Sequence, residues 1–173
     1  MRVSEYIIQR LADAGISRAF LVYGGAIADL VDALPGRMEY TVAISEQGAV
    51  FMAEGWAKVT GKPGLVIATS GPGGQNIVTG LANCYYDSTP LIALTGQVST
   101  KFMRPEGSSL RQLGFQECPI REMVWRITKF AYLAINADSA KWGVDRCLFH
   151  AMDGRRGPVL LDIPTDVQRA EIG

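Results

Sequence analysis

The fold is decided by residues 45–96, which read SEQGAVFMAEGWAKVTGKPGLVIATSGPGGQNIVTGLANCYYDSTPLIALTG. Two stretches with helical spacing alternate there with two short apolar runs, at residues 47–60, 65–69, 75–86 and 91–95. Short apolar runs bounded by turns are typical of strands that are buried on both faces. A strand, a helix and a second strand in this order predict a right-handed crossover between parallel strands.

The same alternation extends toward both ends of the chain. Further helices are expected at residues 4–14, 26–34, 120–126 and 139–152, and further strands at residues 19–23, 40–44, 130–135 and 159–163. Ser4 is the expected N-cap of the first helix. Residues 96–119 show no periodicity, which is typical of a functional or mobile loop. We therefore predict an α/β fold: a three-layer, doubly wound parallel sheet with helices on both faces.

Length and composition restrict the class of protein. The 173 residues suit one domain, which we place at residues 1–173 with the start of a linker at residues 165–173. Seventeen basic residues balance seventeen acidic ones, so no net field attracts nucleic acid or an anionic membrane. Three cysteines without a CxxC pair and a single histidine argue against a zinc site or a disulfide framework. Without a signal peptide, the expected location is the cytoplasm.

Four glycine-rich or polar segments follow predicted strands. They are residues 23–25, 45–46, 69–74 and 96–119. Ligands of open parallel sheets bind beyond the carboxyl ends of the strands. The convergence of these segments at one edge of the sheet therefore predicts a ligand site there.

Glu46 and the turn at residues 70–74 each allow two interpretations. An acid in the first turn of a helix ordinarily complements the helix dipole. Alternatively, Glu46 is a buried carboxylate that holds a proton on a ring nitrogen of a ligand. The turn is either a tight structural turn or a surface for a flat ring, since no phosphate-binding lysine follows it. We interpret His150 as structural, and Arg104, Glu106 and Arg111 as solvated charge rather than a carboxylate-binding site.

Several motifs, taken together, resemble the N-terminal pyrimidine-binding domain of thiamine diphosphate enzymes, in particular the acetolactate synthase-like group. They are VYGGAI (22–27), SEQGAVFMAEGWAKVTGKPG (45–64), ATSGPGGQNIVTGLANCYYDSTPLIALTGQV (68–98), GFQE (114–117), ITK (127–129) and GRRGPVLLDIPTDVQ (154–168). They occur in the order and at the spacing of that family and cover nearly the whole chain.

The resemblance implies a role for each matching residue. Glu46 would hydrogen-bond the N1′ atom of the aminopyrimidine, and would drive the 4′-amino group toward the imino form that removes the thiazolium C2 proton. The resulting ylid would attack a 2-keto acid. The positions that match the cofactor-binding ones are Tyr23, Gly24, Gly25, Thr69, Pro72 and Asn76. Phe115 and Gln116 match the loop that faces the substrate, so Glu46 and Gln116 are the expected catalytic residues.

The resemblance also implies what these residues lack. The family binds diphosphate and Mg²⁺ through a separate domain with a GDG sequence and an Asn pair, and neither occurs here. The implied partner is therefore a diphosphate-binding domain of the same or another subunit, in a homodimer or larger assembly, and the isolated chain is expected to be inactive. A flavin, FAD, would belong to a middle domain of a parent enzyme.

Departures from the family pattern keep the substrate open. Tyr23 stands where the acetolactate synthases usually carry proline, and Ser45 where they usually carry histidine. A related 2-keto acid decarboxylase or carboligase remains an alternative. So do a separate small subunit of a sulfopyruvate or phosphonopyruvate decarboxylase-like complex, and a non-catalytic binding module that keeps the fold.

Overall fold

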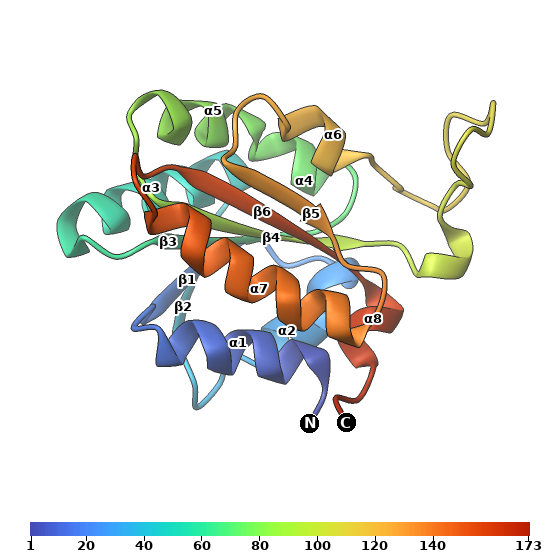
Figure 1. Cartoon of the computed structure of the whole chain (residues 1–173), viewed down its shortest axis with the longest axis horizontal. Coiled ribbons are helices and arrows are strands. Elements are labelled where there is room, and N and C mark those ends of the chain that lie inside the picture. Colours follow the sequence, from blue (N-terminus) through green and yellow to red (C-terminus); the bar gives the residue numbers. More distant parts are fainter.

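A computed structural model describes all 173 residues and contains one six-stranded, all-parallel sheet (Figure 1). The strands are β1 (Arg18–Leu21), β2 (Glu39–Val42), β3 (Gly64–Ala68), β4 (Leu91–Gln97), β5 (Phe130–Leu133) and β6 (Pro158–Pro164). Their order across the sheet is β2-β1-β3-β4-β6-β5. The predicted parallel sheet is thus confirmed, with β2 and β5 at its two edges.

Helices cover both faces of the sheet, as Figure 1 shows. One face carries α1 (Val3–Asp13), α2 (Ala28–Asp32), α7 (Ala137–Met152) and α8 (Thr165–Arg169). The other carries α3 (Glu46–Thr60), α4 (Pro72–Asn76), α5 (Val78–Tyr86) and α6 (Ile120–Val124). Two short 3₁₀ turns, η1 (Gly25–Ile27) and η2 (Thr100–Phe102), lie near the strand ends. The three-layer arrangement is therefore also confirmed.

Two hydrophobic cores lie on opposite faces of the sheet. In β3, Leu65 and Ile67 belong to the core beneath α1 and α7, whereas Val66 and Ala68 belong to the core beneath α3 and α5. Successive residues of a strand point to opposite faces, so a strand covered on both sides has to be apolar throughout. This double burial explains why the central strands read as continuous apolar runs.

The helix ends differ from the sequence expectations at several points. Ser4 does not cap α1: it lies inside the helix, and its hydroxyl is buried without a hydrogen-bond partner. Glu5 closes the first turn instead, because its carboxylate accepts the backbone N–H of Arg2 at 2.8 Å. The helix expected over residues 75–86 is divided into α4 and α5 around Ile77. Strand β4 continues through Gly96 and Gln97, where the irregular segment was expected to begin, and residues 98–119 are irregular, as predicted, apart from η2.

The two chain ends lie side by side (Figure 1). The backbone N–H of Val3 donates to the carbonyl of Ala170 at 2.9 Å, and that of Ile172 donates to the carbonyl of Met1 at 2.9 Å. Residues 165–173, where a linker was expected to begin, include α8, which packs against α1 and α2. The last residues of the chain are thereby joined to the first helix.

Candidate functional site

The carboxyl ends of β1, β2, β3 and β4 bring the four predicted segments to one edge of the sheet. The chain runs from β1 to one neighbour, β2, and then returns past β1 to its other neighbour, β3. Such a reversal is the topological switch point at which open α/β sheets bind ligands. The segments at residues 23–25 and 69–74 follow the two strands that flank this point.

Gly24 and Thr69 are in direct contact across the switch point. A Cβ atom on Gly24 would lie 2.5 Å from the Cβ of Thr69, so only glycine fits. The Thr69 hydroxyl also accepts the backbone N–H of Ala26 at 3.3 Å. The segment after β1 is therefore held directly over the end of β3, with Gly25 exposed beside it.

Glu46 is the first residue of α3, and its helix is capped independently by Ser45, whose hydroxyl accepts the backbone N–H of Gly48 at 3.1 Å. Its Oε2 atom accepts the side-chain amide of Asn76 at 3.0 Å. Its Oε1 atom lies 3.4 Å from where a Cβ of Gly73 would be. No donor of the protein reaches Oε1, which leaves this oxygen available to a ligand.

The expectation that Glu46 is buried is not met in this chain alone. The residue is half-buried, and Asn76 and Pro72 beside it are exposed. The physical reason is that α4 shields the carboxylate from one side only. The rest of the carboxylate is open to solvent.

The loop with Phe115 and Gln116 rests on the glycine turn after β3. A Cβ on Gly71 would lie 2.8 Å from both the Cβ and the carbonyl oxygen of Gln116. Gln116 itself has a positive φ of 60°, which is uncommon outside glycine and asparagine. Strained backbone of this kind persists only where the surroundings hold it, and it is concentrated at functional sites.

Glu117 holds this loop together and was not predicted as a site residue. Its carboxylate accepts the backbone N–H groups of Arg104 at 2.7 Å, Leu113 at 2.9 Å and Gly114 at 3.3 Å. Partial burial acts to raise the pKa of Glu117, but these hydrogen bonds from Leu113, Arg104 and Gly114 keep it below its ordinary value. The sequence contains only a weak indication of this role, because Glu117 lies in a segment without helical or strand periodicity, where nothing predicts which groups its carboxylate contacts.

A cavity of about 1010 Å³ opens between this loop and the strand ends. Its walls include Gly25, Ala26, Thr69, Ser70, Phe115 and Gln116. Phe115 is 86% exposed and forms an open rim. Tyr23, which is 60% exposed, and Glu46 and Asn76 do not line this cavity, so the expected site residues divide into a cavity wall and a neighbouring open face.

The far wall of the cavity comes from the last helix. Asp166 and Arg169 of α8 and Lys101 of η2 line it, and sequence reasoning assigned no role to any of them. Arg104, Glu106 and Arg111, interpreted as solvated charge, do not line it, and all three are exposed. No group of three or more His, Cys, Asp or Glu side chains could hold a metal ion.

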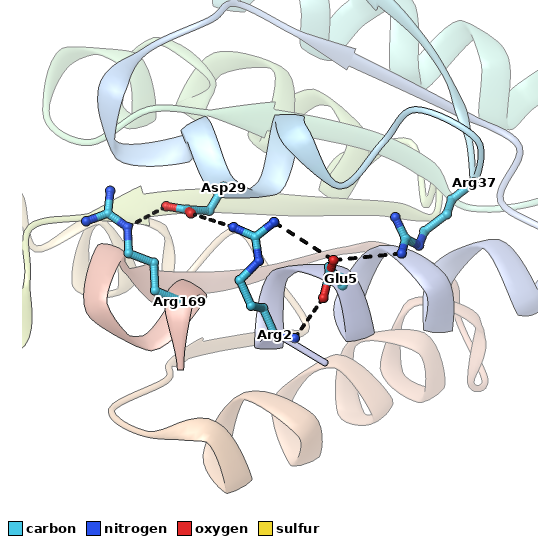
Figure 2. Close-up of polar contacts among 5 residues, drawn as sticks. All are labelled: Arg2, Glu5, Asp29, Arg37 and Arg169. Carbon is cyan, nitrogen blue, oxygen red and sulfur yellow. Dashed lines mark hydrogen bonds and ion pairs between the residues drawn. The ribbon is translucent and has the colours of Figure 1, made fainter. Parts of the chain in front are cut away.

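A charged network fixes the helix that follows the Gly24–Ala26 segment (Figure 2). Asp29 of α2 is 8% exposed and accepts Arg2 at 3.2 Å and Arg169 at 2.9 Å. Figure 2 also shows Glu5 between Arg2 and Arg37. Both chain ends therefore contribute a cation to the anchoring of α2.

Gln168 of α8 supports the same segment from below. It is fully buried, and its side-chain amide donates to the carbonyls of Ala26 and Ile163, both at 2.7 Å. Gly96 in β4 approaches Ala26 as well: a Cβ there would lie 2.1 Å from the Ala26 carbonyl oxygen. The position of Ala26 is thus set by Thr69 directly after β3, by Gly96 of β4 and by Gln168 of α8.

The fold and the site together define a parallel α/β domain with a cavity beyond the carboxyl ends of its strands. Comparison with known proteins identifies the family. A family model described as "Thiamine pyrophosphate enzyme, N-terminal TPP binding domain" matches residues 1–123, and the chain belongs to this family.

Acetolactate synthases are among the relatives that the chain matches. The chain is 40% identical over 168 residues to acetolactate synthase 3, chloroplastic, of Brassica napus. The aligned region covers 96% of this chain and 25% of that relative. It is 36% identical over 166 residues to the acetolactate synthase isozyme 3 large subunit of Escherichia coli (strain K12), covering 95% of this chain and 28% of the relative. The chain therefore spans about a quarter of the length of the first curated relatives it matches. None of the helices in this structure combines the length and the apolar composition that a membrane span needs.

Proposed function

We propose that this chain is the pyrimidine-binding half of a thiamine diphosphate-dependent, acetolactate synthase-like transferase or lyase that acts on 2-keto acids. The observation that carries the proposal is the unpaired Oε1 of Glu46, placed beside the glycine turn at the switch point of the sheet. Family membership supports the cofactor, and the acetolactate synthase relatives support the class of reaction.

The residues of the chain fit the pyrimidine ring of that cofactor. Glu46 would hold a proton at the ring nitrogen through Oε1, while Asn76 keeps the carboxylate oriented through Oε2. Gly24, Gly25 and Thr69 would let the backbone approach one side of the ring, with Tyr23 and Pro72 exposed beside them. When bound, thiamine diphosphate supplies the nucleophilic carbon and the electron sink, and the protein supplies orientation and electrostatics.

The substrate side of the site would be formed by Phe115 and Gln116, which rim the cavity above the glycine turn. The diphosphate, its Mg²⁺ and any FAD would be bound by other domains, in a homodimer or larger assembly. The open face beside Glu46 supports such a shared site, because the carboxylate is shielded from one side only. Three unpaired, buried cysteines suit a reducing compartment, so the cytoplasm is the location that we propose.

The decisive experiment replaces Glu46 by glutamine in the full-length protein and measures exchange of the cofactor C2 proton by NMR. We expect exchange to fall by at least about 100-fold, the scale of a lost general acid–base contribution. Glu122→Gln is the matched control, because Glu122 is also a first-turn acid of a helix. If Glu46 served only the helix dipole, both variants would leave exchange unchanged, and the proposed role would be contradicted.

The isolated 173-residue chain should not consume pyruvate even with thiamine diphosphate and Mg²⁺ added. This expectation follows from the open face beside Glu46 and from the missing diphosphate-binding half. Pyruvate consumption at the rate of the full-length protein would contradict the shared site. Restored activity on mixing with a separately expressed diphosphate-binding domain would support it.

A further inference from the structure

We propose that Gln97 and Asp162 are positioning residues that hold the Phe115–Gln116 loop against the glycine turn. The two residues are 2% exposed each: Gln97 is the last residue of β4, and Asp162 lies within the neighbouring strand β6, opposite Thr95. The substrate consequence of this inference rests on the proposed function, whereas its structural part can be tested without any reaction.

The hydrogen bonds of Gln97 specify the orientation of its side-chain amide. Its Nε2 donates to the carbonyl oxygen of Cys118 at 2.7 Å and to Oδ2 of Asp162 at 3.1 Å, while its Oε1 accepts the backbone N–H of Val98 at 2.9 Å. Every polar atom of the amide thus has a partner of the correct type. Turning the amide over would set its oxygen against two acceptors and its nitrogen against the N–H of Val98, which is costly in a buried site.

Asp162 fixes this orientation from the core side. Its Oδ1 accepts the hydroxyl of Thr95 at 2.7 Å, and its Oδ2 accepts Gln97. The side chain therefore presents only an acceptor to Gln97, and this is what selects the Nε2 side of the amide. The same Nε2 then reaches across to Cys118, so the strand pair β4–β6 is connected to the loop through a single amide group.

The loop needs such an anchor because its conformation is unfavourable on its own. Gln116 has a positive φ, and the backbone of Gln116 lies in contact with Gly71. Glu117 ties the loop to the backbone of Arg104, Leu113 and Gly114, none of which belongs to a strand of the sheet. The carbonyl of Cys118 provides that link two residues after Gln116: it accepts the backbone N–H of Ile120 at 2.8 Å, and Gln97 is its donor from the sheet.

The thiol of Cys118 offers a readout of the loop that does not depend on catalysis. Cys118 is 2% exposed beneath the loop, and Cys84 and Cys147 are fully buried in the two cores. Local opening of the loop would expose Cys118 alone. Global unfolding would expose all three thiols to the same extent.

The experiment measures N-ethylmaleimide labelling of each cysteine in the full-length protein by peptide mass spectrometry. Gln97→Met and Asp162→Leu keep the side-chain shape but remove the hydrogen bonds, and we expect Cys118 to label at least about tenfold faster relative to Cys84 and Cys147, a ratio equivalent to ~1.4 kcal/mol. Asp162→Asn keeps an oxygen for Gln97 and can donate to Thr95 instead, so labelling should stay within about twofold of the unmodified protein.

Thr95→Val is the matched control. It is near-isosteric, equally buried, and removes one hydrogen bond of Asp162 without touching Gln97 or Cys118. We expect it to leave the Cys118 ratio unchanged. If Gln97→Met left the ratio unchanged, or if Thr95→Val raised it as much as Gln97→Met, the positioning role would be refuted.

A second arm measures KM for pyruvate and the dissociation constant of thiamine diphosphate. We expect Gln97→Met to raise KM at least about fivefold with an unchanged cofactor affinity, because the loop faces the substrate and not the pyrimidine ring. Faster Cys118 labelling with an unchanged KM would support the positioning role and contradict the substrate-side assignment of Gln116. Loss of cofactor affinity would instead show that the network supports the glycine turn rather than the substrate loop.

Discussion

Replacing Gly80 by alanine should destabilise the domain, although alanine is the better helix former. Gly80 lies in α5 where that helix crosses α3, and a Cβ there would lie 2.2 Å from Cγ1 and 2.6 Å from Cγ2 of Val50. Carbon atoms pack at about 3.5–4.0 Å, so the two helices would have to separate by more than an ångström. Val50 is fully buried and its branched side chain is restricted to essentially one rotamer in a helix.

The expected magnitude follows from two opposing contributions. Overpacking a core costs about 1–3 kcal/mol, and the upper end applies here because Val50 cannot rotate away. Removing glycine from a helix interior offsets about 1 kcal/mol of this. The net loss for Gly80→Ala should therefore be about 2 kcal/mol.

The partner substitution makes the reasoning testable. Val50→Ala removes two buried methyl groups and should cost about 2–3 kcal/mol. In the double variant the new methyl group of residue 80 occupies part of the vacated space. We expect a total loss of about 1 kcal/mol, where independent effects would sum to about 4–5 kcal/mol.

Urea unfolding followed by circular dichroism gives the four free energies of this double-mutant cycle. A double variant that is as unstable as the sum of the single variants would refute the contact. The Gly80→Ala variant should also weaken the hydrogen bond between Glu46 and Asn76, because α3 carries Glu46 in its first turn.

Three further outcomes follow from the same structure. Gly96→Ala should displace the Ala26 segment, because the new Cβ would lie 2.1 Å from the Ala26 carbonyl oxygen. Calorimetry on the full-length protein should then show cofactor binding weakened at least about tenfold. Gly55→Ala is the control, because that position is open to solvent and the substitution should leave cofactor affinity unchanged. Asp29→Asn should lower the free energy of unfolding by about 1–2 kcal/mol in urea titrations, because it leaves Arg2 and Arg169 without their shared anion. Adding about 1 M salt should change this loss little, because Asp29 is shielded from solvent. Burial raises the pKa of Asp162 to about 7, although the hydrogen bonds from Thr95 and Gln97 act to lower it. Between pH ~4 and ~7 the native state therefore holds a proton that the unfolded state releases. As the pH rises through this range, the free energy of unfolding should fall by up to about 4 kcal/mol relative to that of Asp162→Asn.

Each of these has a clear contrary result. Equal cofactor affinity in the Gly96 and Gly55 variants would show that the Ala26 segment does not bear on the site. An Asp29 variant with unchanged stability would mean that the network in Figure 2 contributes nothing measurable. A constant stability difference between the unmodified protein and Asp162→Asn across that pH range would place the titration of Asp162 elsewhere.

The sheet and its helices could be predicted from the sequence because double burial leaves a visible pattern. In β3 every residue is buried, so Leu65–Ala68 reads as one apolar run, and Gly61 with its positive φ marks the end of α3. The division of α4 from α5 could not be predicted in this way. Residues 75–86 keep helical spacing throughout, and only the geometry around Ile77 separates the two helices.

The candidate site could be predicted only in part, for a different physical reason. Glu46, Thr69 and Gly24 stand at strand ends, and the topology of a parallel sheet brings such residues together. The roles of Glu117, Gln97 and Asp162 depend on contacts between segments far apart in the sequence. The exposure of Glu46 could not be inferred at all, because it depends on which surface covers α4 from outside.

The pairing of the two chain ends has a consequence for how the domain would respond to trimming. The terminal ladder is only a few bonds long and lies at the surface, so it is expected to open before any other part. Once it opens, α8 is held only by its own contacts, among them Arg169 with Asp29, and the hydrogen bond from Gln168 to the Ala26 carbonyl is weakened. A protease that nicks the last few residues would thus loosen the Ala26 wall of the cavity beyond the strand ends from a distance.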